Sequence, residues 1–332
     1  MIPQRDYFDK DIANSNNTSG YYVINENDFV YNPRKSNEAP YGPVSVYKYK
    51  DTGIVSPLYL CFTNTKEINI NYMEQFFKSS SWHRYIYESG DSGARHDRVS
   101  IRDDVFFNMP IFLPKIEEQN LIAKTLFLLD KKISRQQELL DNLKLYKRGV
   151  ISTLNCTALE CHEIAVGNVF SITRGNVLAT GNISPIKTEK FCYPVYSSQT
   201  KNDGLLGYYS DYLYEDAITW TTDGANAGYT KFRKGKFYCT NVCGVLINND
   251  GYANNYVAEL INSISKRHVS YVGNPKLMNN VMAEVKINLP NIEKQEFFSR
   301  TISLIDSKIS KECSILNSLL MTKNALLQKM FI

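Results

Sequence analysis

Most of the short motifs that mark an enzyme are missing from this sequence. No Gly-x-x-x-x-Gly-Lys-Ser/Thr loop is present to cradle a nucleotide phosphate, and no Gly-x-Gly-x-x-Gly opens a strand–helix unit. The four histidines are scattered, with no Ser/His/Asp order around them. The Asn-Pro pair at residues 32–33 lacks the second proline and the aromatic residue of an amino-methyltransferase pocket. These absences favour a protein that binds rather than catalyses.

Long apolar runs and a cysteine framework are also missing. No run reaches the roughly 18 apolar residues that cross a membrane, and no signal peptide is recognisable at the start. The seven cysteines are odd in number and show no regular spacing. Cys239 and Cys243 have no second pair of ligands nearby, which favours core positions over a zinc site. We therefore expect a reduced, cytoplasmic protein without metal or membrane contact.

Length and composition indicate a folded chain with more than one core. The 332 residues exceed one ordinary domain, and 43% hydrophobic with 22% charged residues is a globular composition. The 23 tyrosines suit either β-strands or wet recognition surfaces. The net charge of +4 is low for a free-standing DNA-binding protein. Any basic surface must therefore be local, or partner subunits must complete it.

The chain contains an internal duplication. Residues 113–119, Leu-Pro-Lys-Ile-Glu-Glu-Gln, return as residues 289–295, Leu-Pro-Asn-Ile-Glu-Lys-Gln, at an offset of 176 residues. The offset holds without a gap for roughly forty residues more, which is a strong sign of true duplication. Proline near the start and glutamate in the first turn are typical of a helix N-terminus. Each copy therefore predicts a long helix.

Both predicted helices carry a coiled-coil seam, in which apolar residues recur at alternating steps of four and three. The seam positions are Ile122, Leu126, Leu129, Ile133, Leu140 and Leu143 in the first helix, and Ile302, Ile305, Ile309, Leu316 and Leu319 in the second. Polar residues interrupt both seams at matching places, Gln136 with Glu312 and Lys147 with Lys323, and such residues fix register and partner. We expect the two helices to pair with each other, although each could instead pack on its own globular domain.

A globular module precedes each helix. The expected segments are residues 1–112, 113–156, 157–288 and 289–332, in the order module, helix, module, helix. Short alternating segments rich in Tyr, Val, Asn and Gly predict mixed α/β modules, and hence an α+β fold overall. The modules align weakly, and the first lacks about 25 residues or more at its start relative to the second. We therefore expect a shortened first module, or a start codon placed too late.

Two basic patches, one in each module, are candidates for nucleic-acid contact. Arginine reads guanine bidentately, asparagine reads adenine, and lysine or arginine holds phosphate. Between Asp223 and Asp250 the sequence has no acidic residue but several lysines and an arginine. A plain solvated surface is the alternative interpretation of each patch. The candidate contact residues are Tyr31, Asn32, Arg34, Lys35, Arg95 and Arg98 in the first module, and Thr221, Asn226, Tyr229, Lys231, Arg233 and Lys276 in the second.

The order module, Leu-Pro-x-Ile-Glu-x-Gln and long helix, repeated once, resembles the specificity (S) subunit of type I restriction–modification systems. Residues 31–34, 223–245 and 273–279 are similar to segments of that family's target-recognition domains, and the resemblance covers nearly the whole chain. It implies two target-recognition domains that each read one half of a split site in double-stranded DNA. It also implies an antiparallel coiled coil that sets the gap between the half-sites.

The same resemblance implies a non-enzymatic chain that works with partners. Two modification (methyltransferase) subunits would dock on the helices, and restriction subunits would supply translocation and cleavage. S-adenosylmethionine, ATP and Mg would bind those partners, and no cofactor would bind this chain. A helix pair of roughly 50 Å would place the centres of the half-sites about 10–15 base pairs apart.

Alternatives from other classes stay open at this point. The chain could be a coiled-coil interaction protein that does not bind DNA, or a silent cassette that no longer specifies a site. It could also be an enzyme that uses Cys239, Cys243 or His96 as a nucleophile or ligand. A steep fall of binding with salt would argue against the first alternative. Loss of activity in folded Cys→Ser variants would be needed to support the last.

Overall fold

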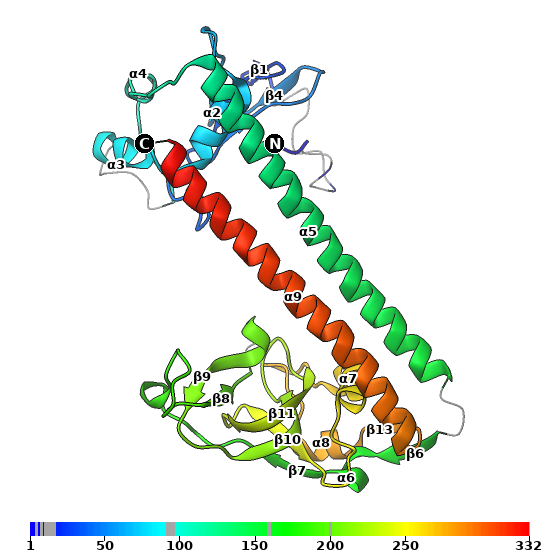
Figure 1. Ribbon diagram of the computed structural model, residues 1–332. Helices are drawn as coiled ribbons and strands as arrows, with labels where there is room; N and C mark the ends of the chain where they lie inside the picture. The colour runs from blue at the N-terminus through cyan, green and yellow to red at the C-terminus, as the bar shows by residue number, and fades with distance from the viewer. Residues whose placement is uncertain are drawn as a thin grey trace. The chain divides into compact units, whose positions relative to one another are not determined.

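The computed structural model describes residues 1–3, 6, 9, 18–90, 97–157, 161–198 and 201–331. It confirms the predicted α+β class, with two mixed modules and two long helices, α5 (Ile116–Thr157) and α9 (Ile292–Met330) (Figure 1). The chain divides into two compact units. Unit 1 consists of Met1–Glu138 with Cys313–Ile332, and unit 2 is Leu139–Glu312. Each unit thus holds one module with parts of both helices, and the four-part division drawn from the sequence stays a prediction.

Unit 1 is built around a small antiparallel sheet with an aromatic core. Its central strand β2 pairs with β3 on one side and β5 on the other, and β1 pairs with β4 separately. Tyr31 stacks on Phe106 with ring centres 4.9 Å apart, and Trp82 meets Tyr31 edge-on. Large rings bury much area per residue, which compensates for short strands. The module's elements are β1 (Tyr22–Ile24), β2 (Phe29–Tyr31), β3 (Val44–Val46), β4 (Gly53–Val55), β5 (Leu60–Phe62), α2 (Ile70–Lys78), α3 (His83–Ser89) and α4 (Asp103–Phe107).

Unit 2 contains a larger, six-stranded sheet in the order β7-β12-β10-β11-β8-β9. Neighbouring strands are antiparallel except β11 and β8, and β13 pairs with β6 in a second sheet. Ile261 of α7 shares a buried cluster with Trp220 of β10. The module's elements are β6 (His162–Ala165), α6 (Val166–Val169), β7 (Ser171–Arg174), η1 (Thr180–Asn182), β8 (Tyr193–Tyr196), η2 (Lys201–Gly204), β9 (Leu205–Tyr209), β10 (Tyr214–Thr221), β11 (Thr230–Cys239), β12 (Cys243–Ile247), α7 (Asn255–Ser265), η3 (Lys266–His268), α8 (Asn279–Glu284) and β13 (Lys286–Leu289).

The duplicated Leu-Pro-x-Ile-Glu-x-Gln motif makes equivalent contacts in both units. The side-chain nitrogens of Gln119 and Gln295 each donate to the carbonyl of the motif's own proline at 2.8 Å. The side-chain oxygen of Gln119 accepts from the Asn69 N–H at 3.0 Å, and that of Gln295 accepts from the Asn254 side chain at 3.3 Å. These asparagines cap α2 and α7. The motif therefore ties the start of each long helix to the main helix of its module.

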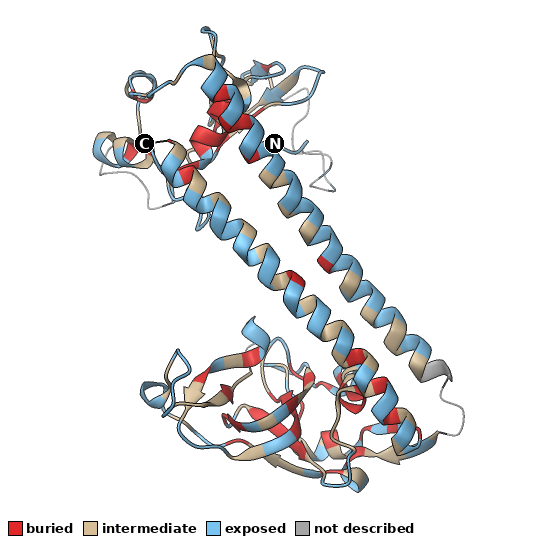
Figure 2. Ribbon diagram, in the orientation of Figure 1, coloured by how far each residue is buried: buried red, intermediate tan, exposed pale blue. Residues whose placement is uncertain are grey.

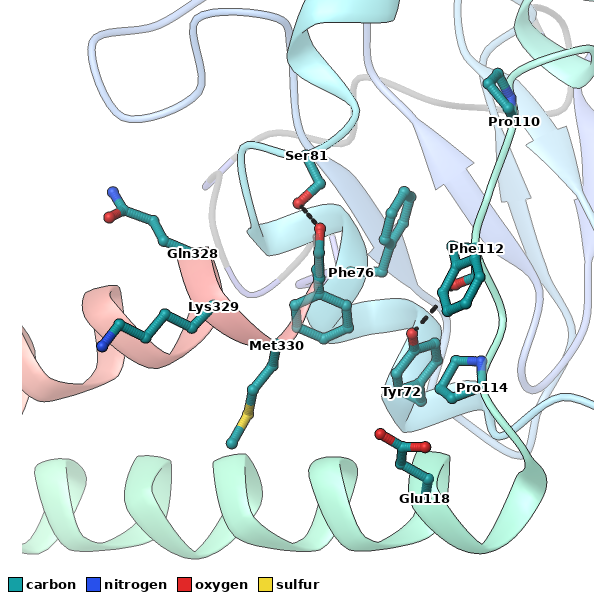
Figure 3. Close-up of a pocket in the computed structure, with 11 residues that line it drawn as sticks. Tyr72, Phe76, Ser81, Pro110, Phe112, Pro114, Glu118, Gln328, Lys329 and Met330 are labelled. Atoms are coloured by element: carbon teal, nitrogen blue, oxygen red, sulfur yellow. Dashed lines mark hydrogen bonds between the residues drawn. The ribbon is translucent and has the colours of Figure 1, made fainter.

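Burial along α5 and α9 follows the heptad pattern (Figure 2). Every predicted seam position is buried or half-buried, and Leu126 and Ile302 are fully enclosed. Within each unit the two helix segments run antiparallel (Figure 1). The end of α9 also reaches the aromatic core of unit 1, where Phe331 packs 5.1 Å from the Tyr72 ring and its carbonyl accepts from the Ser81 hydroxyl (Figure 3).

Two matching ion pairs join the helices, one in each unit. The Lys147 ammonium lies 2.8 Å from Asp306 in unit 2, and the Lys323 ammonium lies 2.6 Å from Asp130 in unit 1. The two lysines are equivalent in the duplication, and so are the two aspartates. Burial by itself would lower the pKa of Lys147, but attraction to Glu259 and Asp306 outweighs burial and raises that pKa. The polar seam positions thus carry specific partners.

Replacing Lys147 with methionine should destabilise unit 2, because Glu259 and Asp306 would lose the cation between them. We expect the free energy of opening α7, measured by hydrogen exchange at pH 7, to fall by about 1–3 kcal/mol. A group whose pKa is higher in the folded than in the unfolded state stabilises the folded state fully at pH values below the unfolded-state pKa. This stabilisation is lost as the pH rises through the folded-state pKa. The difference in opening free energy between the parent chain and the Lys147→Met variant should therefore shrink only as the pH rises above the ordinary lysine pKa of 10.5.

Lys144→Met is the matched control for this measurement. The Lys144 side chain is 55% exposed, and its ammonium lies 3.8 Å from Asp141 on the same helix. An exposed pair of this kind contributes little to stability. Equal losses in the two variants would show that the Lys147 contacts do not stabilise the unit.

Candidate nucleic-acid interface

Two loops of unit 1 pair with each other through their backbones. One loop leaves the end of β2, and the other precedes α4. The Lys35 N–H donates to the Asp97 carbonyl at 2.9 Å, and the Val99 N–H donates to the Pro33 carbonyl at 2.8 Å. These two bonds hold the loops together in a short antiparallel bridge.

The bridge in unit 1 brings together basic residues that are far apart in the sequence. Arg34 lies directly opposite Arg98, and Lys35 follows on the same loop as Arg34. Arg34 and Lys35 are exposed, and Arg98 is half-buried. The side-chain oxygen of Asn32 accepts from the Arg34 N–H at 3.0 Å, so this asparagine shapes the loop. Three of the predicted contact residues therefore form one local basic surface.

Unit 2 repeats the same loop pairing. The loop after β10 and the loop before α8 form the equivalent two backbone bonds, each 2.9 Å long. They place Asp223 opposite Lys276, at the positions that Arg34 and Arg98 occupy in unit 1. The Lys276 ammonium lies 3.8 Å from the Asp223 carboxylate, and Lys276 is exposed. The duplication thus extends to the loops, although the position of Arg34 in unit 1 is occupied by an acidic residue, Asp223, in unit 2.

A basic turn that the sequence analysis missed lies beside this loop in unit 2. The η3 turn (Lys266–His268) ends α7 and consists of three exposed residues, Lys-Arg-His. The Ser265 hydroxyl donates to the Gly228 carbonyl at 2.5 Å and so holds the turn against the loop that carries the exposed Asn226. The signal in the sequence was a basic run directly after an amphipathic helix.

Three of the predicted contact residues are buried, and their side chains are withdrawn from the candidate surface. Tyr31 is 2% exposed, Thr221 5% and Arg233 7%. The Tyr31 hydroxyl donates to a backbone carbonyl at 2.8 Å, and burial raises its pKa. Tyr229 is half-buried, and burial raises its pKa too. Arg95 lies outside the described residues.

Two basic residues of β11, Lys231 and Arg233, serve the fold of unit 2. The Arg233 guanidinium lies 3.8 Å from the centre of the Tyr196 ring, and its Nε donates to the Thr219 hydroxyl at 3.1 Å. Lys231 is half-buried and forms an ion pair with Asp203. Both cations are therefore already engaged by neighbouring side chains.

The side chains that a catalytic interpretation needs are poorly placed for it. Cys239 and Cys243 are buried, and burial raises the pKa of both thiols, that of Cys243 to about 11. Neither thiol is a reactive thiolate near neutral pH. His96 lies outside the described residues. Where the chain is described, no group of three His, Cys, Asp or Glu could hold a metal, and no helix is both long and apolar enough to cross a bilayer.

Comparisons with known sequences point to one family. Residues 160–320 match the family model of the type I restriction modification DNA specificity domain. The chain is 37% identical over 134 residues to a putative type I specificity subunit N-terminus of Mycoplasma pneumoniae, covering 40% of this chain and 70% of that protein. It is 35% identical over 134 residues to the MpnII specificity subunit of the same organism, covering 40% of this chain and 39% of that subunit. The aligned part thus spans less than half of the MpnII subunit.

Two solved structures share the fold. The S subunit of a type I restriction–modification system from M. genitalium aligns with a TM-score of 0.62 at 18% identity, covering 97% of this chain and 87% of that chain. A chain from a study of complex assembly in the type I system aligns with a TM-score of 0.55 at 14% identity, covering 93% and 82%. At these identities the likeness establishes the fold alone.

Arg233 and Lys276 should respond in opposite ways to substitution by alanine. Arg233→Ala removes a buried cation from the Tyr196 face, and we expect the free energy of unfolding to fall by about 1–3 kcal/mol. Lys276→Ala should change stability by less than about 0.5 kcal/mol, but weaken duplex DNA binding and reduce its salt slope by about 1. Urea denaturation and anisotropy titrations at several salt concentrations measure both. A stable Arg233→Ala chain that has lost DNA binding would return Arg233 to the contact surface.

Proposed function

Because this chain belongs to the specificity subunits of type I restriction–modification systems, we propose that each module reads one half of a split site in double-stranded DNA. Such subunits are not themselves enzymes. The observation that carries the proposal is the duplicated loop bridge, which presents basic side chains on or beside the same two loops in both units. A single basic loop could be plain surface, but the same arrangement twice in one chain favours a shared task.

In the proposed contact, the bridged loops enter the major groove. Arg34 and Arg98 are suited to guanine edges or phosphates, Asn226 to an adenine edge, and Lys35 and Lys276 to phosphates. Phosphate contacts position a protein, whereas base contacts specify the sequence. Because the net charge is only +4, partner subunits supply a large part of the phosphate neutralisation in this proposal.

The long helices have two tasks in the proposed function. The first is to set the gap between the half-sites, since a helix keeps a fixed rise of about 1.5 Å per residue. α5 has 42 residues and α9 has 39, which is much longer than packing against one module requires. The second task is to dock the partner subunits.

Each unit exposes a pair of large apolar side chains on the first part of a long helix. Leu121 and Leu128 of α5 are 65% and 54% exposed, and Phe297 and Leu304 of α9 are 66% and 73% exposed. The pairs are equivalent in the duplication, and the seven-residue spacing puts both members on one face. Such surfaces are typical of protein contacts.

Two equivalent surfaces fit two copies of one partner, and we assign them to the modification methyltransferase subunits. In the same proposal, restriction subunits join the complex, S-adenosylmethionine, ATP and Mg bind the partners, and this chain binds none of them.

The methylome of a host that carries this gene with its methyltransferase tests the recognition role. We expect methylated adenine on both sides of a split, asymmetric motif, and complete loss of that motif when the gene is deleted. Inserting one heptad into both α5 and α9 should lengthen the gap by about 3 base pairs and leave both half-sites unchanged, because seven residues add about 10 Å.

The control for the insertion is a variant with seven substitutions on the exposed faces of the same helices and no change in length. An unchanged methylome after deletion would rule out the recognition role. Altered half-site bases with an unchanged gap would rule out the helices as the spacer while leaving recognition intact.

The docking surfaces should be separable by paired substitutions. Leu121→Glu with Leu128→Glu should remove one methyltransferase subunit from the complex, and Phe297→Glu with Leu304→Glu should remove the other, because a charge in an apolar contact costs several kcal/mol. Native mass spectrometry counts the bound subunits. The matched control places glutamate at Lys124 and Lys131, which are exposed on α5. Retention of two subunits in both paired variants would exclude these surfaces.

A further inference from the structure

β7 completes one edge of the sheet in unit 2. It pairs antiparallel with β12, with Ile172 opposite Leu246 and Arg174 opposite Gly244. The Arg174 Nε also donates to the side chain of Asn279, the first residue of α8, at 2.9 Å. One short strand therefore closes the sheet edge and joins it to α8.

Unit 1 contains the same edge in β5. β5 flanks β2 as β12 flanks β10, and both pairs are antiparallel. With β2 aligned on β10 through the loop bridge, in which Arg34 and Asp223 are equivalent, Phe62 takes the position of Leu246 and Leu60 that of Gly244. α4 takes the place of α8, and Asp103 takes the position of Asn279. Within the part of unit 1 that the structure describes, β5 is an edge strand with nothing paired to its outer side.

A groove of about 480 Å³ lies at this open edge. Residues 57–61, which lead into β5 and form its first part, make one side of the lining, and Asp103 and Phe107 of α4 contribute to the other. Three apolar side chains in the lining are strongly exposed, Leu58 at 61%, Phe107 at 56% and Tyr22 at 49%. An unpaired strand edge beside exposed apolar side chains is the arrangement that accepts an added strand.

A second strand position in unit 1 is open as well. Residues 286–289 form β13 in unit 2 and pair with β6, whereas their counterparts at 110–113 form no strand. Leu289 is 5% exposed, but its counterpart Leu113 is 39% exposed. This segment is held by side-chain contacts: Ile111 packs against the aromatic core, and the Tyr72 hydroxyl donates to the Phe112 carbonyl at 3.5 Å (Figure 3). Unit 2 buries these positions with its segment β6-α6-β7, to which no described residues of unit 1 correspond.

We propose that the β5 edge of unit 1 accepts an extended strand of the β7 type, donated by a second polypeptide. The strand runs antiparallel to β5, with an apolar residue opposite Phe62 and an arginine opposite Leu60. The arginine guanidinium bonds the Asp103 carboxylate, a stronger contact than the neutral amide of unit 2 provides. Unit 2 supplies the template for this site, since it contains the completed edge.

The test uses a fluorescein-labelled peptide with the sequence of residues 168–176, Asn-Val-Phe-Ser-Ile-Thr-Arg-Gly-Asn, titrated into the full chain. We expect saturable binding, slower alkylation of Cys61 and slower amide exchange in β5. Exchange in β3, the opposite edge of the same sheet, and alkylation of Cys313 should not change.

Charge reversal tests the predicted register. Glutamate in place of the peptide's arginine should weaken binding about tenfold, the effect of losing one charge-assisted hydrogen bond. Asp103→Lys in the chain should restore binding of that glutamate peptide. Proline in place of the peptide's isoleucine should abolish binding, because proline cannot donate to the strand ladder. If Asp103→Lys does not fold, Asp103→Asn should still weaken binding of the arginine peptide.

Absence of saturable binding would overturn the proposal, and so would equal protection of β3 and β5 or equal binding of the proline peptide. Competition by a short DNA duplex at the same site would assign the groove to DNA and would also overturn it. None of the positive readouts requires DNA recognition or methylation. Failure of the strand site would therefore leave the proposed function standing. Failure of the proposed function would likewise leave the strand site standing.

Discussion

The rest of the structure depends on two buried amides, those of Gln119 and Gln295. Each side chain donates to a proline carbonyl where its long helix begins, and accepts from the asparagine that caps the main helix of its module. Both are almost fully enclosed, so separating helix from module would leave polar atoms unpaired in an apolar surrounding. The long helix and its module are therefore oriented together in each unit, which is the condition for a helix to place a recognition loop.

The modules also share the ends of the helices, which explains why neither helix forms a unit of its own. The aromatic core of unit 1 includes Leu126 of α5 and Phe331, which directly follows α9. The core of unit 2 includes Ile302 of α9, with Leu154 of α5 packed against it. Each module is thus closed by the start of one helix and the end of the other. Because each helix must reach from its own module to the other one, a change in the length of one helix requires a matching change in the other.

The sequence predicted the helices and their seams well because their signal is periodic and occurs twice. The candidate contact surface was harder to predict, because it depends on a bridge between loops that only the folded chain brings together. Arg34 meets Arg98 through backbone bonds that no side-chain pattern encodes. Arg233 looked like a surface cation, but its strand turns it toward Tyr196, and a long side chain can reach a buried ring. Burial depends on neighbours distant in sequence, so residue type alone could not separate Arg233 from Lys276.

The paired loops show how one scaffold can carry different recognition chemistry. Backbone hydrogen bonds hold the loops in both units, and such bonds do not depend on which side chains the bridged residues carry. The bridged positions hold Arg34 and Arg98 in unit 1 but Asp223 and Lys276 in unit 2. Two like charges face each other in the first case and favour an anionic ligand between them, whereas in the second the Asp223 carboxylate offsets part of the charge of the exposed Lys276. Under the proposed function, the two half-sites are therefore read with different chemistry on the same loop geometry.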